Sequence, residues 1–188
     1  QVELQAGSVK RCKIVRIWYH IDSIWTGQTA VIVGGGSLVT AAHFRSIALA
    51  RLENRCRVIV VNDAVYPAWW ADWLHSSDYK WWHANVQCLQ SFDGIKTTID
   101  DIVPPQWITG CLRVTGVRGF DLNPGCIRTG NNSGYQAMHC AIHTGVKRIV
   151  LVGFDMAGER WHVGLLNEPK VDYPSVMLPN FDSLVPAL

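Results

Sequence analysis

Three consecutive glycines lie where a buried apolar run gives way to a helical pattern. The run from Thr29 to Val33 is rich in β-branched residues and is followed by Gly34, Gly35, Gly36 and Ser37. Backbone N–H groups and the helix dipole converge at such a junction, and glycine lets a phosphate approach the backbone closely. We therefore expect these four residues to contact the phosphate of a nucleotide. A plain strand-to-helix turn is the alternative.

Polar side chains also follow two other strand-like runs. Asn62 and Asp63 come directly after the run from Arg57 to Val61, and Asp155 lies shortly after the run from Arg148 to Val152. Ligands of open parallel sheets bind at the carboxyl ends of the strands. We expect Asn62 to hydrogen-bond a base or ribose, Asp63 to hold a hydroxyl or a metal ion, and Asp155 to face the same crevice. An Asx turn or a helix cap is the alternative for the first two.

A second loop of small and polar residues, Thr129 to Tyr135, leads into a helical segment. Asn132, Ser133 and Gly134 lie at the expected helix N-terminus, where unpaired N–H groups offer a further anion site. Plain helix capping by Asn132 or Ser133 is the alternative. In the polar segment after the third strand, His162 is the candidate general base, because histidine titrates near neutral pH. An ordinary loop histidine is the alternative for that residue.

The other histidines and the cysteines form no metal-site pattern. His139 and His143 lie four residues apart without an H-E-x-x-H motif, which favours core or surface positions. The six cysteines form no C-x-x-C pair, which favours free thiols, buried at Cys56 and Cys140, over a zinc site or a disulfide scaffold. We expect no metal site and a cytoplasmic protein.

Five of the nine tryptophans lie between Trp69 and Trp82. They are candidates for a wall that stacks on a base or sugar ring, or for a partner-binding patch that includes a homo-oligomer interface. An exposed patch of Trp69, Trp70 and Trp82 would favour the partner-binding role. The alternative is core filling beneath a helix, with Trp69 and Trp73 on one face.

The elements that position these residues are typical of an α/β protein. A helical pattern from Thr40 to Asn54 joins the first two strands in a βαβ unit, and a helix from Gly134 to His143 leads to the third strand. Near-continuous apolar strands are typical of a parallel sheet covered on both faces. We predict a single Rossmann-like domain over residues 1–188, with a mostly parallel sheet, helices on both faces and a core over about residues 29–165.

The middle of the chain, from about Trp69 to Arg128, is harder to divide. A Pro-Pro pair interrupts it, short strands fit Cys111 to Thr115 and the surroundings of Ile127, and we assign it as mixed loop, helix and edge strand. A further strand is expected at Lys13 to Trp18. The segment from Phe181 onward is typical of the middle of an amphipathic helix, so a sequence truncated at its C-terminus is one expectation.

Composition argues against several classes of protein. The 188 residues are 48% hydrophobic and 17% charged, which is enough for one packed core and shows no disorder signature. The formal charge is +2 and the basic residues are scattered, so duplex nucleic acid is not expected as a partner. No apolar run approaches the roughly 20 residues of a membrane span, and no signal-peptide pattern is present.

Four motifs follow one another along the chain: A-V-I-V-G-G-G-S-L, V-I-V-V-N-D-A, N-S-G-Y-Q-A and K-R-I-V-L-V-G-F-D-M. Their order resembles a family of uncharacterised phage and prophage proteins, over roughly Thr29 to His162. That family is distantly similar to bacterial sialyltransferases with a G-x-G-x-S-L loop and to archaeal 6-hydroxymethylpterin diphosphokinases. The resemblance to the sialyltransferases implies a cytidine monophosphate donor held by Gly34, Gly36, Ser37 and Asn62, a donor site lined by Ser133 and Gly134, and His162 as the base.

Three functions are compatible with these residues. The leading hypothesis is a metal-independent, glycosyltransferase-like enzyme that binds a nucleotide or nucleotide-sugar, needs no cofactor, and uses N–H donors to stabilise the leaving phosphate while His162 deprotonates the acceptor. The second is pyrophosphoryl transfer from ATP, with Asp63 and Asp155 holding Mg²⁺. The third is a non-catalytic phage structural or binding protein that uses the tryptophan segment as its contact surface.

Overall fold

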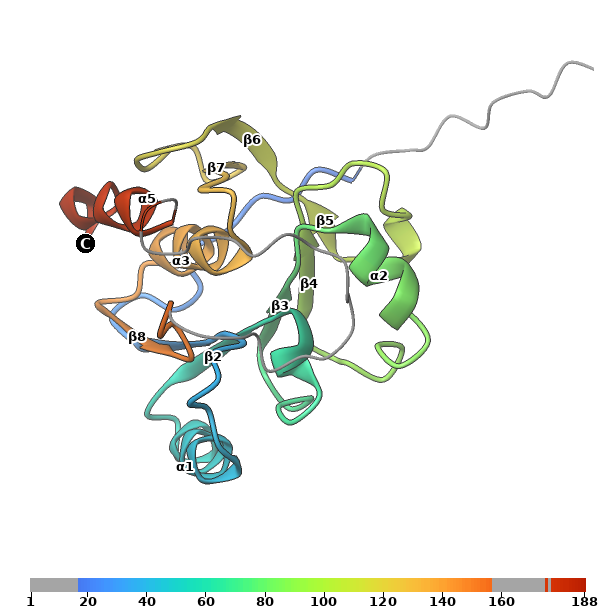
Figure 1. The fold of residues 1–188 in the computed structure, drawn as a ribbon, viewed down its shortest axis with the longest axis vertical. Helices are drawn as coiled ribbons and strands as arrows, with labels where there is room; N and C mark the ends of the chain where they lie inside the picture. Colours follow the sequence, from blue (N-terminus) through green and yellow to red (C-terminus); the bar gives the residue numbers. More distant parts are fainter. Residues whose placement is uncertain (1–16, 157–174, 176) are drawn as a thin grey trace, which may run out of the picture.

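The computed structural model describes residues 17–156, 175 and 177–188. The candidate base His162 and residues 13–16 of the expected N-terminal strand lie outside this part of the chain. The described residues form a six-stranded sheet, a separate two-stranded sheet and helices packed against the larger sheet (Figure 1). The prediction of an α/β fold is therefore confirmed. No helix in the described ranges is long and apolar enough to cross a bilayer.

The larger sheet has the strand order β5-β4-β3-β2-β1-β8, and every pair of neighbours is parallel. The order reverses at β1, because β2 to β5 are added on one side of it and β8 on the other. The predicted strands at β1, β2 and β8 are confirmed with the same bounds. The six strands are β1 Thr29–Val33, β2 Arg57–Val61, β3 Trp73–His75, β4 Ile95–Thr98, β5 Gly110–Cys111 and β8 Arg148–Val152.

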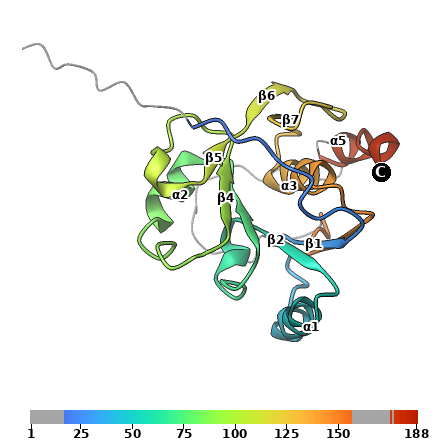
Figure 2. The same cartoon turned by 180° about the vertical axis from the view of Figure 1, so that it is seen from behind.

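Apolar side chains alternate along the strands, so both faces of the sheet are buried. On one face Ile32 and Ile59 belong to a core cluster with residues of α3, Ser133–His143. On the other face Val58 belongs to a second cluster that includes residues of α1, Ala41–Leu52. The helix α2, Tyr79–Asn85, adds Trp82 to this second cluster. Helices thus lie on both faces of the sheet (Figure 2).

Both predicted helices form, and each begins at a capping residue. At the start of α1 the N–H of Thr40 donates to Nδ1 of His43 at 3.1 Å. At the start of α3 the side chain of Asn132 accepts from the N–H groups of Gly134 at 2.8 Å and Tyr135 at 3.1 Å. Capping by Asn132 is therefore confirmed. It satisfies two of the donors that a helix N-terminus leaves unpaired.

The middle of the chain contributes two strands that sequence reasoning did not find. Both β3 and β4 lie inside the sheet, so their assignment to mixed loop and edge strand is wrong. Trp73 is fully buried in β3, and the helix expected to carry it together with Trp69 does not form. The expected strand from Cys111 to Thr115 is divided between the two sheets. Its second part belongs to β6, Arg113–Gly116, which pairs with β7, Cys126–Arg128.

The short elements that remain lie around these sheets. They are the 3-10 turns η1 Asn62–Val65, η2 Pro105–Trp107 and η3 Val185–Ala187, and the short helix α5 Leu178–Asp182. The side chain of His139, in α3, is fully buried, as are the free thiols of Cys56 and Cys140. The two predictions of buried thiols are confirmed, and of the two positions considered for His139 the structure shows the core.

Candidate functional site

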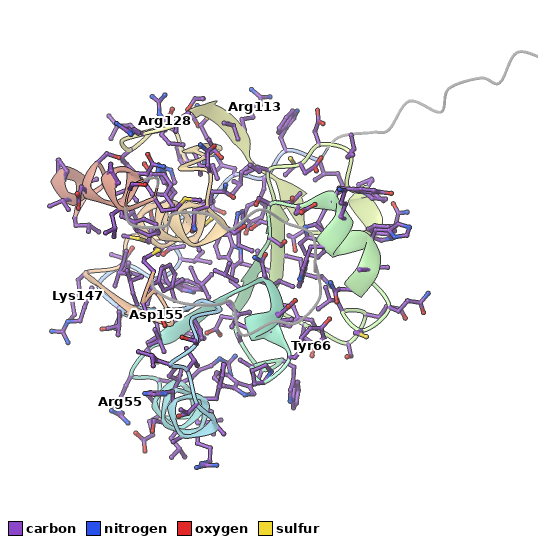
Figure 3. The ribbon with its side chains drawn as sticks, viewed as in Figure 1. Arg55, Tyr66, Arg113, Arg128, Lys147 and Asp155 are labelled. Carbon is purple, nitrogen blue, oxygen red and sulfur yellow. The ribbon has the colours of Figure 1, made fainter. Side chains whose placement is uncertain are left out.

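The candidate residues gather at the carboxyl edge of the larger sheet. Gly34 follows β1, Asn62 follows β2 and Gly153 follows β8. The helix α3 begins at the same edge, because it leads back to the amino end of β8. In open parallel sheets the crevice beside the strands at which the order reverses is the usual place for a ligand. Here those strands are β1 and β8, and Figure 3 shows Asp155 at the end of β8.

The glycine loop packs directly against the chain that leaves β8. The N–H of Gly34 donates to the carbonyl of Val152 at 2.8 Å, and the N–H of Gly36 donates to that of Gly153 at 2.9 Å. A Cβ atom on Gly34 would lie 2.8 Å from the carbonyl oxygen of Gly153, and one on Gly36 would collide with the carboxylate of Asp155. The first and third glycines are therefore required by the close approach of two backbones. Their N–H groups are engaged within the protein.

Three other N–H groups of this loop are left for a ligand. Those of Gly35, Ser37 and Leu38 make no hydrogen bond with the described part of the chain. The hydroxyl of Ser37 donates to Oδ2 of Asp155 at 3.0 Å. This bond ties the loop to the exit of β8 on the solvent side. A phosphate at this loop would thus contact the N–H groups of Gly35, Ser37 and Leu38.

The second predicted loop is closed by its own cap and by an aromatic ring. Because Asn132 accepts from the N–H groups of Gly134 and Tyr135, neither is free for an anion. The ring of Phe154 lies against Gly134, where a Cβ atom would collide with it. A Cβ atom on Gly34 would lie 3.1 Å from the same ring. Phe154 therefore fills the space between the two loops.

Sequence reasoning missed Ser77, which lies beyond the carboxyl end of β3. Its Oγ lies 2.7 Å from Oγ of Ser133, and its N–H donates to the same hydroxyl at 3.3 Å. A single serine forms no sequence motif, and the three-residue strand before it was not predicted. Only the sheet topology shows that Ser77 lies at this edge. The pair places two half-buried hydroxyls where α3 meets the sheet.

A buried chain of hydrogen bonds fixes α3 on the sheet below this pair. His75 is fully buried, with Nδ1 2.9 Å from Oγ1 of Thr97 and Nε2 2.8 Å from Oε1 of Gln136. Since Trp73 donates to the same Thr97 hydroxyl and the Gln136 oxygen only accepts, a neutral ring that accepts at Nδ1 and donates at Nε2 satisfies every group. Burial lowers the pKa of His75 to about 4. The ring is therefore neutral at pH 7.

Unusual backbone angles also gather at the carboxyl edge. Four residues other than glycine have a positive φ in the described ranges. Three of them lie at this edge: Asn62 at 52°, Asn131 at 52° and Met156 at 49°. Backbone strain of this kind is concentrated at ligand sites. The Asn62 side chain makes no hydrogen bond with the described residues, so its amide is available to a ligand.

An open groove of about 470 Å³ lies beside the glycine loop. It is formed by that loop, the first turn of α1 and the end of β8. Because Nδ1 of His43 accepts from the Thr40 N–H, the other ring nitrogen can donate to a ligand. The lining residues are mostly apolar, with His43 and Asp155 as the exceptions: Leu38, Val39, His43, Leu151, Val152, Gly153, Phe154 and Asp155.

The two carboxylates considered for Mg²⁺ are held by different neighbours. Asp63 accepts from the indole N–H of Trp81 at 2.6 Å, whereas Asp155 accepts from Ser37. Within residues 17–156, 175 and 177–188, no group of three or more His, Cys, Asp or Glu is arranged to hold a metal ion.

The tryptophan segment is divided between the surface and the core. Trp69 is 69% exposed and Trp70 is half-buried, but Trp82 is fully buried. For Trp82 the structure bears out the alternative of core filling, because its ring belongs to the core cluster beneath α2. Its indole N–H donates to the carbonyl of Ser76 at 3.0 Å, which satisfies the polar atom inside that core.

Comparison of the chain with protein-family models, curated proteins and solved structures found no match.

Proposed function

We propose that the protein is a glycosyltransferase-like enzyme that binds a nucleotide-activated donor, without a metal ion, at the carboxyl edge of a Rossmann-like sheet. The observation that carries the proposal is the meeting of the glycine loop with the Asp155 loop beside β1 and β8. The strand order reverses at these two strands, and the groove opens at the same place. A ligand held there would contact both loops.

The donor would be held by groups from separate strands. The N–H groups of Gly35, Ser37 and Leu38 would receive the phosphate, and the N-terminus of α1 adds the favourable end of its dipole. The Asn62 amide, one strand away, would hydrogen-bond the base or ribose. The hydroxyl pair of Ser77 and Ser133 would contact the sugar.

In the transfer, the oxygen of an acceptor hydroxyl forms a bond to the anomeric carbon while the bond from that carbon to the donor phosphate breaks. The N–H donors would stabilise the negative charge that develops on the leaving phosphate. The acceptor proton passes to a general base, for which His162 is proposed from the resemblance alone. His75 is unsuited to this role because both of its ring nitrogens are engaged and its pKa is lowered to about 4 by burial.

Titration calorimetry with a panel of cytidine, uridine and adenosine nucleotides tests the proposal. We expect binding that persists in EDTA and that Ser37→Trp abolishes. Ser46→Trp, on the exposed side of α1, is the matched control and should leave binding unchanged. Absence of binding by the intact protein would overturn the proposal. Affinity that requires Mg²⁺ and falls with Asp63→Asn and Asp155→Asn would replace it with pyrophosphoryl transfer.

A further inference from the structure

The two edge strands of the larger sheet, β5 and β8, differ in what pairs with them. At β5 the segment 17–19 continues the pairing, because Cys111 donates to the carbonyl of Ile17 and accepts from the N–H of Tyr19, both at 2.8 Å. At the other edge, β8 has β1 as its only strand neighbour in the described part of the chain. Its sequence, Arg-Ile-Val-Leu-Val, contains no proline or glycine and one charge. Edge strands are usually protected by such features or by a covering segment.

Apolar side chains are exposed on the same flank. Val150 and Leu151 are each 39% exposed, whereas four of the five residues of β1 are buried. Figure 1 shows α5 on the same side of the view as β8. Apolar residues of α5 and η3 are also exposed, among them Leu178 and Val185. Exposed apolar groups gathered on one side of a protein mark an interaction surface.

The hydrogen bond from Gly34 to Val152 indicates which backbone groups of β8 face outward. Val152 directs its carbonyl toward β1, and by alternation Val150 does the same. The N–H and C=O groups of Ile149 and Leu151 therefore point away from the sheet. A second copy related by a twofold axis through Val150 would pair Ile149 with Leu151 of the partner subunit, with hydrogen bonds in both directions.

Charge selects the antiparallel arrangement. Lys147 and Arg148 are exposed at the start of β8, and Asp155 lies beyond its end, as Figure 3 shows for Lys147 and Asp155. An antiparallel pair brings the basic end of one strand to the acidic end of the other. A parallel pair would place the two basic ends together. In the register centred on Val150, Lys147 lies beside the end of the partner's β8, the strand that Asp155 follows by three residues.

We propose that β8 pairs antiparallel with β8 of a second copy of this chain, so that the two six-stranded sheets become one continuous sheet. This interface is a different surface from the tryptophan segment. Because Asp155 also holds Ser37, the interface borders the glycine loop, and the partner's Lys147 adds a positive charge beside it. The pairing does not depend on the proposed nucleotide site.

Sedimentation velocity from low to high micromolar concentration tests the pairing. We expect a monomer–dimer equilibrium whose Kd rises about tenfold in Lys147→Glu, because one attractive charge pair becomes repulsive at each end. Leu151→Pro should abolish the dimer without disturbing β1, since only an outward N–H is lost. A chain that stays monomeric throughout, or a dimer unaffected by Leu151→Pro, would overturn the proposal.

Disulfide trapping gives a second test in protein whose Cys12 and Cys88 are replaced by serine. Val150→Cys lies on the axis as a non-hydrogen-bonded pair, for which the Cα separation of about 4.5 Å suits a disulfide. Under mild oxidation it should form a covalent dimer. Val114→Cys, an exposed valine on β6, is the matched control and should stay monomeric. Equal cross-linking of both variants would contradict the proposed register.

Discussion

The hydroxyl of Ser37 donates to Oδ2 of Asp155 at 3.0 Å and so joins two loops that are 118 residues apart in sequence. The bond is exposed, so its net contribution to stability is small. It nevertheless fixes the end of the glycine loop against the exit of β8. Removing it should therefore change ligand binding more than folding.

We expect Ser37→Ala to lower nucleotide affinity about tenfold while it changes the free energy of unfolding by about 1 kcal/mol or less. Calorimetry and urea unfolding measure the two effects. Ser46→Ala on the exposed side of α1 is the control and should alter neither by a comparable amount. Equal nucleotide affinity in Ser37→Ala and the parent protein would show that the bond does not position the loop.

Gly36→Ala should destabilise the fold because its Cβ atom would collide with the Asp155 carboxylate and lie 2.7 Å from the carbonyl carbon of Gly153. The expected loss is about 1–3 kcal/mol, as for other overpacked sites. Gly125→Ala is a suitable control, since its nearest neighbour would lie at an ordinary 3.5 Å. Denaturant unfolding of the two variants measures the difference. A loss no larger than that of the control would contradict the close packing of the two loops.

Gln136→Leu should cost about 2–3 kcal/mol, because it leaves Nε2 of the fully buried His75 without a partner and removes the hydrogen bond from Gln136 to the Thr129 carbonyl. The exposed Gln90→Leu provides a control for the change of residue type. Equilibrium unfolding in urea measures both. If the two variants are equally stable, the buried chain of hydrogen bonds does not hold α3 on the sheet.

Stability should fall in mild acid because two histidines are buried in the neutral form. Burial lowers the pKa of His75 and of His139 to about 4, below the 6.5 of an exposed histidine. As the pH falls from 6.5 toward 4, the unfolded chain binds protons that the folded chain does not, so this stability is complete above pH 6.5 and is lost below it. The expected loss by pH 5 is about 2 kcal/mol for each histidine.

Urea unfolding between pH 7 and pH 5 measures this slope, and His75→Gln should make it shallower. His20→Gln is the matched control for the change of residue type, because His20 is exposed. A slope that is the same in His75→Gln and in the parent protein would show that His75 does not titrate in this way.

The strands that were predicted correctly are those whose amino-acid composition alone favours a strand. β1, β2 and β8 each have five residues, rich in valine and isoleucine, and this composition favours a strand wherever it lies. By contrast, β3 is Trp-Leu-His and β4 is Ile-Lys-Thr-Thr. Such short segments have no detectable periodicity. They become strands because β2 offers an edge to β3, and β3 in turn offers one to β4.

The candidate site was predictable in location but not in detail. Gly34, Asn62 and Asp155 follow three predicted strands, so their shared edge follows from a parallel sheet. The N–H groups of Gly34 and Gly36 are bonded to carbonyl groups at the end of β8. No local sequence pattern links that segment to the glycine loop, so these bonds could not be predicted. The position of Ser77 likewise depends on a strand that sequence did not reveal.

The pairing of β1 with β8 also sets the order in which the molecule can be completed. The chain must be synthesised to residue 152 before β1 gains its second neighbour, and to Asp155 before the glycine loop is held. Contacts of such long sequence separation form late and slow the folding of a domain. On the ribosome, β1 to β5 can therefore assemble first. The glycine loop is fixed in place only after nearly the whole described chain has been synthesised.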